Sequence, residues 1–161
     1  MSLSREVKLK KDIQSPRHEA LLNIARTAGF LEKKSQTFFG QFDMTEAQYN
    51  VLIVLKLEGR SLTQVEIGER LISSRANITA LIDRLEAKGY VERKDAAKDR
   101  RFYEIHLTKT GRQILDKVEK VYLEQVEALM AALSLTECQT ISRALEKLRD
   151  SLRKIQAGGK V

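Results

Sequence analysis

The sequence predicts a mainly α-helical fold with one small β-hairpin. Its 161 residues include only eight glycines and one proline, and chain breakers this rare favour long helices over a strand-rich fold. Charged residues make up 32% of the chain, above the usual share of about 25%, which is typical of long amphipathic helices with solvated outer faces. Strand-like patterns occur only near residues 90–107. The length suits one ordinary domain.

The first long helix is expected over residues 16–40. It follows a polar and basic segment, residues 1–15, which we expect to be a flexible arm. Ser15 is a favourable N-cap, and a proline at the first helical position fits a helix start. A second helix is expected after Thr45, because Thr45 and Gln48 have the spacing of a capping box.

Two further helices follow in quick succession. Thr63 and Glu66 repeat the capping-box pattern and start a short helix that ends near Leu71. Another helix is expected over residues 74–88, with Gly89 as its stop. Two short helices joined by about three residues are typical of a helix-turn-helix unit.

The strand-like patterns come directly after this unit. Residues 90–93 and 102–107 are expected to form two short strands, since the second alternates apolar and polar side chains. The segment between them, DAAKDRR at residues 95–101, is a charged hairpin tip. A hairpin that follows a helix-turn-helix is a wing, so residues 41–111 are predicted to form a winged helix-turn-helix domain.

The C-terminal part is expected to be helical again. A long helix starts after Thr108, and Thr136 with Gln139 predicts a capping box at the start of the last helix. Residues 157–161 are expected to be a disordered tail. The last helix carries an apolar seam with alternating spacings of four and three, suited to packing against another helix: Ile141, Leu145, Leu148, Leu152 and Ile155.

The charge of the chain favours an anionic partner. The formal net charge is +7, and the sequence pI is about 9.6, which indicates nucleic acid or an anionic membrane surface. No run approaches the roughly 18 consecutive apolar residues of a membrane span, and the first residues lack the apolar core of a signal peptide. The single cysteine fits a reducing compartment, so we expect a cytoplasmic protein without a membrane partner.

The helix at residues 74–88 has two different faces. Ile78, Ile82 and Leu85 lie on one apolar stripe that must pack inward, and the opposite face is small and polar. Small residues let a helix enter the major groove, where Arg75 and Asn77 offer bidentate contacts to guanine and adenine. An ordinary solvated face explains the same pattern. The candidate DNA-contacting residues of the helical part are Thr63, Gln64, Ser73, Ser74, Arg75, Ala76, Asn77, Thr79 and Arg84.

The hairpin tip adds a second group of candidates. Lys98, Arg100 and Arg101 are cations on a protruding loop, which suits the narrow and negative minor groove of DNA. Asp99 would repel phosphate, so we interpret it as a carboxylate that holds a neighbouring arginine, Arg101, in an extended position. The alternative is a charged turn in which Asp99 has no role.

These patterns together resemble the MarR family of bacterial transcriptional regulators. The resemblance covers about residues 17–155 and is most specific over residues 74–111. The matching motifs are Asp83-Arg84-Leu85-Glu86, Gly89, Val91-Glu92-Arg93, Asp99-Arg100-Arg101, Leu107-Thr108 and Gly111. The sequence departs from the family at Ala80, where many relatives carry an arginine, and at residues 95–97, where relatives often have an Asp-Pro turn.

The resemblance implies a homodimer whose dimerisation region comprises residues 16–40 and 112–156. It also implies a recognition helix in the major groove, a wing arginine in the minor groove and a pseudo-palindromic double-stranded operator. Relatives commonly repress transcription, and many release DNA when a small, often aromatic or phenolic, effector enters a crevice between the dimerisation and DNA-binding parts.

Other chemistries find little support in the sequence. His18 and His106 lack partners at metal-ligand spacing, and no catalytic motif or cofactor-binding loop is recognisable, so we expect no enzyme, metal or cofactor. Cys138, at the start of the last helix, is expected to be a packed thiol, although a redox role stays open. Aromatic residues of the first two helices are core candidates with effector binding as the alternative, so no effector-binding residues are assigned: Phe30, Phe38, Phe39, Phe42 and Tyr49.

The leading hypothesis is therefore a repressor that a small effector releases from its operator. One alternative is a DNA-binding or architectural protein that has no effector. The other alternative is a protein-interaction module whose basic face binds an acidic partner.

Overall fold

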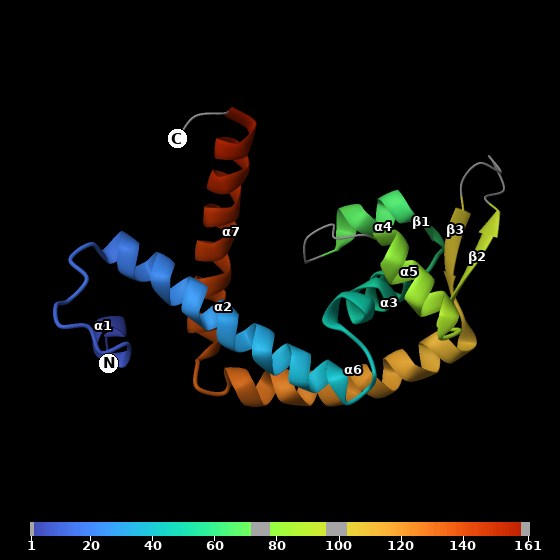
Figure 1. The fold of residues 1–161 in the computed structure, drawn as a ribbon, viewed down its shortest axis with the longest axis horizontal. Coiled ribbons are helices and arrows are strands. Elements are labelled where there is room, and N and C mark those ends of the chain that lie inside the picture. The colour runs from blue at the N-terminus through green and yellow to red at the C-terminus, as the bar shows by residue number, and fades with distance from the viewer. Residues whose placement is uncertain (1, 72–77, 96–102, 159–161) are drawn as a thin grey trace. The chain divides into compact units, whose positions relative to one another are not determined.

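The computed structural model describes residues 2–71, 78–95 and 103–158. Residues up to Val118 and residues from Glu119 onward form two compact units, which we describe separately. Figure 1 shows the elements, which are mostly helical, as predicted. In chain order they are α1 (Leu3–Glu6), α2 (Pro16–Gly40), α3 (Glu46–Glu58), β1 (Leu62–Thr63), α4 (Gln64–Arg70), α5 (Ile78–Ala87), β2 (Val91–Asp95), β3 (Tyr103–Leu107), α6 (Lys109–Met130) and α7 (Leu135–Gly158).

The three strands form one antiparallel sheet in the order β1-β3-β2. The predicted hairpin is confirmed, with Arg93 of β2 opposite Ile105 of β3. The sheet also contains β1, which the sequence pattern does not predict. This strand has only two residues, Leu62 opposite Ile105 and Thr63 opposite Glu104, and a segment so short shows no alternation.

The core of the first unit lies between the helix-turn-helix and the sheet. Ile67 of α4, Ile82 of α5 and Ile105 of β3 are fully buried, as is Leu52 of α3. The apolar stripe predicted for α5 faces this core, because Ile82 and Leu85 are at most 1% exposed. Burial of such side chains supplies about 1.5–3 kcal/mol each, so this packing fixes how α5 sits on the sheet.

The local signals for helix starts were mostly correct. Both predicted capping boxes of the first unit are present, at the starts of α3 and α4. The capping box predicted at Thr136 is wrong, because α7 begins two residues earlier. There Ser134 accepts a hydrogen bond from the Glu137 amide (3.3 Å), and Glu137 accepts one from the Ser134 amide (2.8 Å). Both pairs have the spacing of a capping box, and the sequence pattern alone does not choose between them.

The segment before α2 contains the short helix α1. Its Leu3 is 5% exposed and its Ser4 is 2% exposed. The Leu3 amide donates to Glu19 of α2 (3.3 Å), and Glu6 forms an ion pair with Arg26 of α2 (2.6 Å). These long-range contacts hold α1 against α2, and they are not visible in the polar composition of residues 1–15.

The start of α6 lies very close to the chain after α5. A Cβ atom added to Gly111 would lie 2.0 Å from the backbone oxygen of Tyr90. The neighbouring Thr108 caps α6, since its hydroxyl oxygen accepts from the Gly111 amide (2.9 Å) and donates to the Gly89 carbonyl oxygen (2.7 Å). Only glycine allows the two segments to approach this closely, and this explains why residue 111 is a glycine.

Candidate nucleic-acid interface

The structure describes four of the predicted contact residues. Thr63 and Gln64 lie at the start of α4, and Thr79 and Arg84 lie on α5. The remaining predicted contacts are outside the described residues, so their positions stay predictions: Ser73, Ser74, Arg75, Ala76, Asn77, Lys98, Asp99, Arg100 and Arg101.

Thr63 acts as the cap of α4. Its hydroxyl oxygen accepts from the Glu66 amide (3.3 Å) and donates to a Glu66 carboxylate oxygen (3.0 Å). The Thr63 amide donates to the same carboxylate (2.8 Å). The side chain is therefore engaged within the helix start, and it fixes the direction of α4.

Gln64 and Thr79 connect the two helices of the helix-turn-helix. The Thr79 hydroxyl donates to the side-chain oxygen of Gln64 over 3.1 Å. Thr79 is exposed and Gln64 is half-buried. This bond orients the Gln64 amide beside the exposed face of α5, so both predicted contacts lie on one surface.

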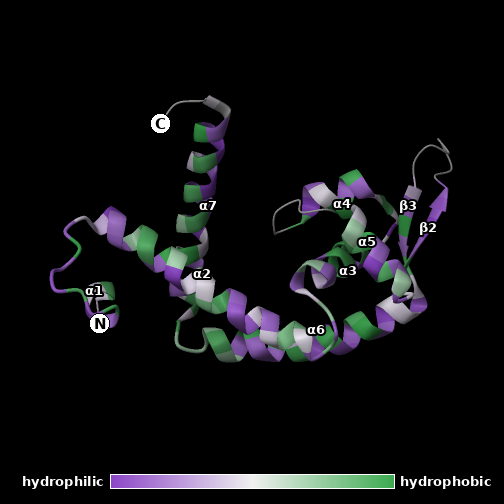
Figure 2. Ribbon diagram, viewed as in Figure 1, coloured by the Kyte–Doolittle hydropathy of each residue, from purple (hydrophilic) through white to green (hydrophobic). Residues whose placement is uncertain are grey.

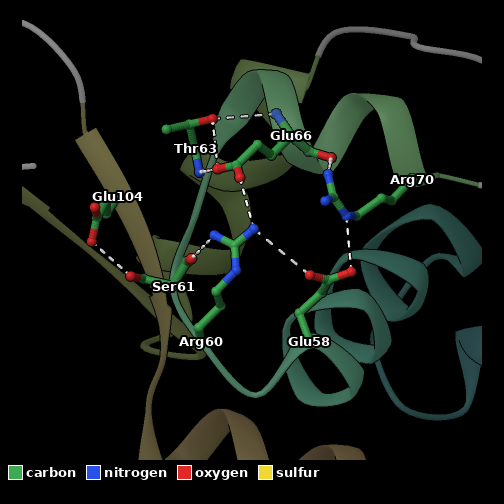
Figure 3. A network of polar contacts seen from close by, with 7 residues as sticks. All are labelled: Glu58, Arg60, Ser61, Thr63, Glu66, Arg70 and Glu104. Carbon is green, nitrogen blue, oxygen red and sulfur yellow. Dashed lines mark hydrogen bonds and ion pairs between the residues drawn. The ribbon is translucent and has the colours of Figure 1, made fainter.

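A polar network holds α4 against α3 (Figure 3). At its centre the Arg60 guanidinium donates to Glu66 over 2.8 Å and lies 3.7 Å from Glu58. Arg70, in the last turn of α4, donates to Glu58 over 2.9 Å. Both ends of α4 are thus linked to Glu58, the last residue of α3. We call Glu58, Arg60, Glu66 and Arg70 the α4 network.

The network changes the acidity of Glu66. The hydrogen bond from Arg60, followed by the one from the Thr63 amide, lowers the pKa of Glu66 to about 2. The carboxylate is therefore ionised at all physiological pH values. Next to it, the Ser61 hydroxyl donates to Glu104 of β3 over 2.6 Å, so the same loop also contacts the wing sheet (Figure 3).

A second polar cluster connects the wing to α5. Arg93 of β2 donates to Asp83 over 2.5 Å and also to Glu86, and its amide donates to Glu86 over 3.0 Å. In the sequence these residues stand out only as positions of the family motifs. The spacing of Asp83 and Glu86, three apart on one helix, is the signal that could have indicated a shared partner.

Arg84 lies on the other side of α5, beside an open surface cavity of about 430 Å³. The buried Gln48 of α3 and Lys88 after α5 also line this cavity. Lys88 donates to the Asp43 carboxylate over 2.7 Å and to the Asp43 carbonyl oxygen. This pair fixes the turn between α2 and α3 to the end of α5.

The other candidate residues are the aromatic residues of the first two helices, Cys138 and His106. Phe38, Phe39 and Tyr49 are at most 5% exposed and pack ring against ring, as core residues do. The core prediction is wrong for Phe30, which is 54% exposed. Cys138 is half-buried beside an open hollow on α7. His106 lies 3.7 Å from Glu104. Among the described residues, no three His, Cys, Asp or Glu side chains gather as metal ligands, and none of the described helices has the length and apolarity of a membrane span.

Comparison with known proteins agrees with this geometry. A model of the MarR family matches residues 42–101, which include α3 to β2. The transcriptional repressor MprA of Escherichia coli K12 is 31% identical over 132 residues, which are 81% of this chain and 74% of that protein. The regulator PapX of Escherichia coli is 30% identical over 119 residues, 73% of each chain.

A solved structure of a MarR-family regulator has the same fold. A crystal structure of a mutant Escherichia coli MarR complexed with operator DNA superposes with a TM-score of 0.69 at 25% identity. The superposition covers 83% of this chain and 99% of that one. The helix-turn-helix, the wing and the sequence relatives lead to one conclusion: this chain belongs to the MarR family of transcriptional regulators, which bind DNA and are not enzymes.

Proposed function

We propose that this protein is a dimeric repressor that binds a pseudo-palindromic operator in the cytoplasm and is released by a small effector. The proposal rests on one observation: α4, α5 and the β2–β3 hairpin pack around the same core. This arrangement offers a helix to the major groove and a hairpin to the neighbouring minor groove. Its relatives include a protein named a transcriptional repressor and a MarR mutant solved with operator DNA.

Dimer formation is supported by α7. None of the described side chains of this 24-residue helix is buried within its own unit. Leu152 is 50% exposed and Ile155 is 44% exposed, and both belong to the predicted apolar seam. Figure 2 shows hydrophobic and hydrophilic residues alternating along α7. A helix with such a face gains its stability by packing against another helix, and a second copy of this chain is the proposed partner.

Effector release is supported by the cavity beside Arg84. Its volume of about 430 Å³ lies in the range of sites for small ligands. The lining includes the apolar Met44 and Ala87, the cations Arg84 and Lys88, and Asp43, which pairs with Lys88. Because two cations face one carboxylate, we propose a small carboxylate with an apolar, aromatic body as ligand. Such a carboxylate competes with Asp43 for Lys88 and loosens the end of α5.

Selection of bound sequences from random duplex DNA tests the operator proposal. We expect an enriched inverted repeat with half-sites about one helical turn, or 34 Å, apart. Titration of a panel of aromatic acids against the selected duplex then tests effector release. An enriched motif without release by any ligand favours the effector-independent DNA-binding protein. Weak binding without any enriched motif favours the protein-interaction module.

A further inference from the structure

Arg93 occupies an unusual position for a charged residue of a small sheet. It lies in the middle of β2, and its side chain is only 19% exposed. Both of its carboxylate partners, Asp83 and Glu86, belong to α5. We call these three residues the Arg93 clamp.

The clamp joins strand and helix through both side chain and backbone. The two terminal nitrogens of Arg93 contact different carboxylates, Asp83 at 2.5 Å and Glu86. The second oxygen of Glu86 accepts from the Arg93 amide over 3.0 Å. A planar guanidinium with two partners defines an orientation as well as a distance, which a single lysine contact does not do. Burial alone would lower the pKa of Arg93, but the hydrogen bonds to Asp83 and Glu86 outweigh it and raise the pKa.

The next residue of the strand offers a direct contrast. Lys94 forms an ion pair with Glu92 over 2.6 Å, and the two side chains are 55% and 48% exposed. This pair links β2 only to itself. Exposed pairs of this kind contribute little to stability. One strand therefore contains an ion pair that joins two elements and an ion pair that does not.

The clamp joins the two proposed DNA-contacting elements, α5 and the wing, near the point where the hairpin tip begins. Two residues after Arg93, β2 ends at Asp95, and the hairpin tip follows. Asp83 lies on α5 between the predicted contact residues Thr79 and Arg84, with a side chain that is 57% exposed. A carboxylate on this face would repel DNA phosphates, so its presence needs a reason. Its ion pair with Arg93 supplies that reason.

We propose that Arg93 is a positioning residue for DNA binding, which holds the wing at a fixed distance and angle from α5. This inference rests on the proposed function, in which α5 and the wing tip contact the same DNA. Two linked contact sites bind more tightly when their geometry is set in advance, because the second contact then costs less conformational entropy. Arg93 supports DNA binding through the wing, without itself being required to contact DNA.

The direction in which affinity changes when a negative charge is removed distinguishes this role from general electrostatic repulsion. Asp83→Asn removes a negative charge near the proposed DNA surface, and simple repulsion predicts tighter binding. The clamp predicts weaker binding, by about fivefold, because the wing loses part of its support. Glu92→Gln is the matched control, since it removes a negative charge from β2 and leaves the clamp intact. It should leave affinity within about twofold or tighten it.

The experiment measures the affinity of the full chain for the selected duplex by fluorescence anisotropy at several salt concentrations. We expect Arg93→Gln to weaken binding by about 10-fold, and Lys94→Gln, which removes the same charge one residue later, by less than about twofold. In an Arg101→Ala background, Arg93→Gln should add less than about twofold, because the proposed wing contact is already absent. Arg93→Lys keeps the charge without the double contact and should be intermediate.

The outcomes distinguish the clamp from the proposed function. If the unmodified protein binds no duplex with sequence preference, the proposed function fails. If it binds its operator while Arg93→Gln behaves like Lys94→Gln, or while the effects of Arg93→Gln and Arg101→Ala simply multiply, the positioning role is overturned. Thermal unfolding of each variant verifies that it is folded at the assay temperature. Should Arg93→Gln unfold there, Asp83→Asn decides the question, because it leaves the contacts between Arg93 and Glu86 in place.

Discussion

The guanidinium of Arg60 lies 2.8 Å from the carboxylate of Glu66, the residue that closes the capping box of α4. A residue of the loop after α3 therefore stabilises the first turn of the next helix. Since Arg70 of α4 also contacts Glu58 of α3, the first helix of the helix-turn-helix is held at both ends by charged contacts. The orientation of α4 is thus set by long-range polar contacts in addition to the apolar core.

Glu66 should make the stability of the protein sensitive to acid. Its pKa is lowered to about 2 in the folded protein, below the ordinary value of 4.5. The stabilisation is therefore fully present above pH 4.5 and is lost as the pH falls toward 2. Glu66→Gln keeps a capping side chain without the charge. We expect it to cost about 1 kcal/mol at pH 7 and to flatten the pH dependence between pH 4.5 and 2. Urea unfolding of both proteins at several pH values measures this; identical pH slopes would refute the role of the ion pair.

Gly111→Ala should be strongly destabilising. The new Cβ would lie 2.0 Å from the Tyr90 carbonyl oxygen, which is backbone and has little room to move. We expect a loss of about 2–3 kcal/mol. Gly40→Ala is the matched control in another helix, because nothing lies within 4 Å of its added Cβ, and it should be neutral or slightly stabilising. Equal melting temperatures for the two variants would contradict the close approach of α6 to Tyr90.

Asp99→Ala should weaken operator binding even though it removes a negative charge. The reason is that the Asp99 carboxylate is predicted to hold Arg101 in the position that reaches the minor groove. We expect Arg101→Ala to weaken binding as well. Affinities measured at one fixed salt concentration check both predictions, and tighter binding by Asp99→Ala would show that its orienting role is wrong.

Asn77→Ala should change sequence preference more than overall affinity. An asparagine reads adenine through two hydrogen bonds in the major groove, so its loss should relax the preference at one base pair of each half-site, at a cost of about 1–3 kcal/mol for the preferred base. Repeating the selection from random DNA with this variant reveals the change. An unaltered motif would exclude direct readout by Asn77.

Much of the fold was predictable because its signals are local. Thr45 and Thr63 start helices through bonds to residues three positions away, and the stripe of Ile82 and Leu85 follows from helical periodicity. Such patterns need no knowledge of the rest of the chain. The capping box placed at Thr136 failed because Ser134, two residues earlier, offers an equivalent start.

The features that were missed depend on residues distant in sequence. Strand β1 exists because Leu62 pairs with Ile105 of β3, and α1 is held by contacts to α2. Arg93 is closer in sequence, ten residues from Asp83 and seven from Glu86, but it meets them only after the hairpin has packed on α5. The segments that contact DNA in the proposed function stay a prediction from the sequence, whereas the polar contacts of α4, α5 and β2 follow from tertiary packing.

The most direct test of the central proposal compares the selected operator duplex with a scrambled duplex of the same composition, titrated with the full chain at increasing salt concentrations. We predict two chains per operator, an affinity roughly 1,000-fold higher for the operator than for the scrambled duplex, and a steep loss of affinity with salt. Equal and weak affinity for both duplexes at physiological salt would contradict the proposal that this protein is an operator-binding repressor.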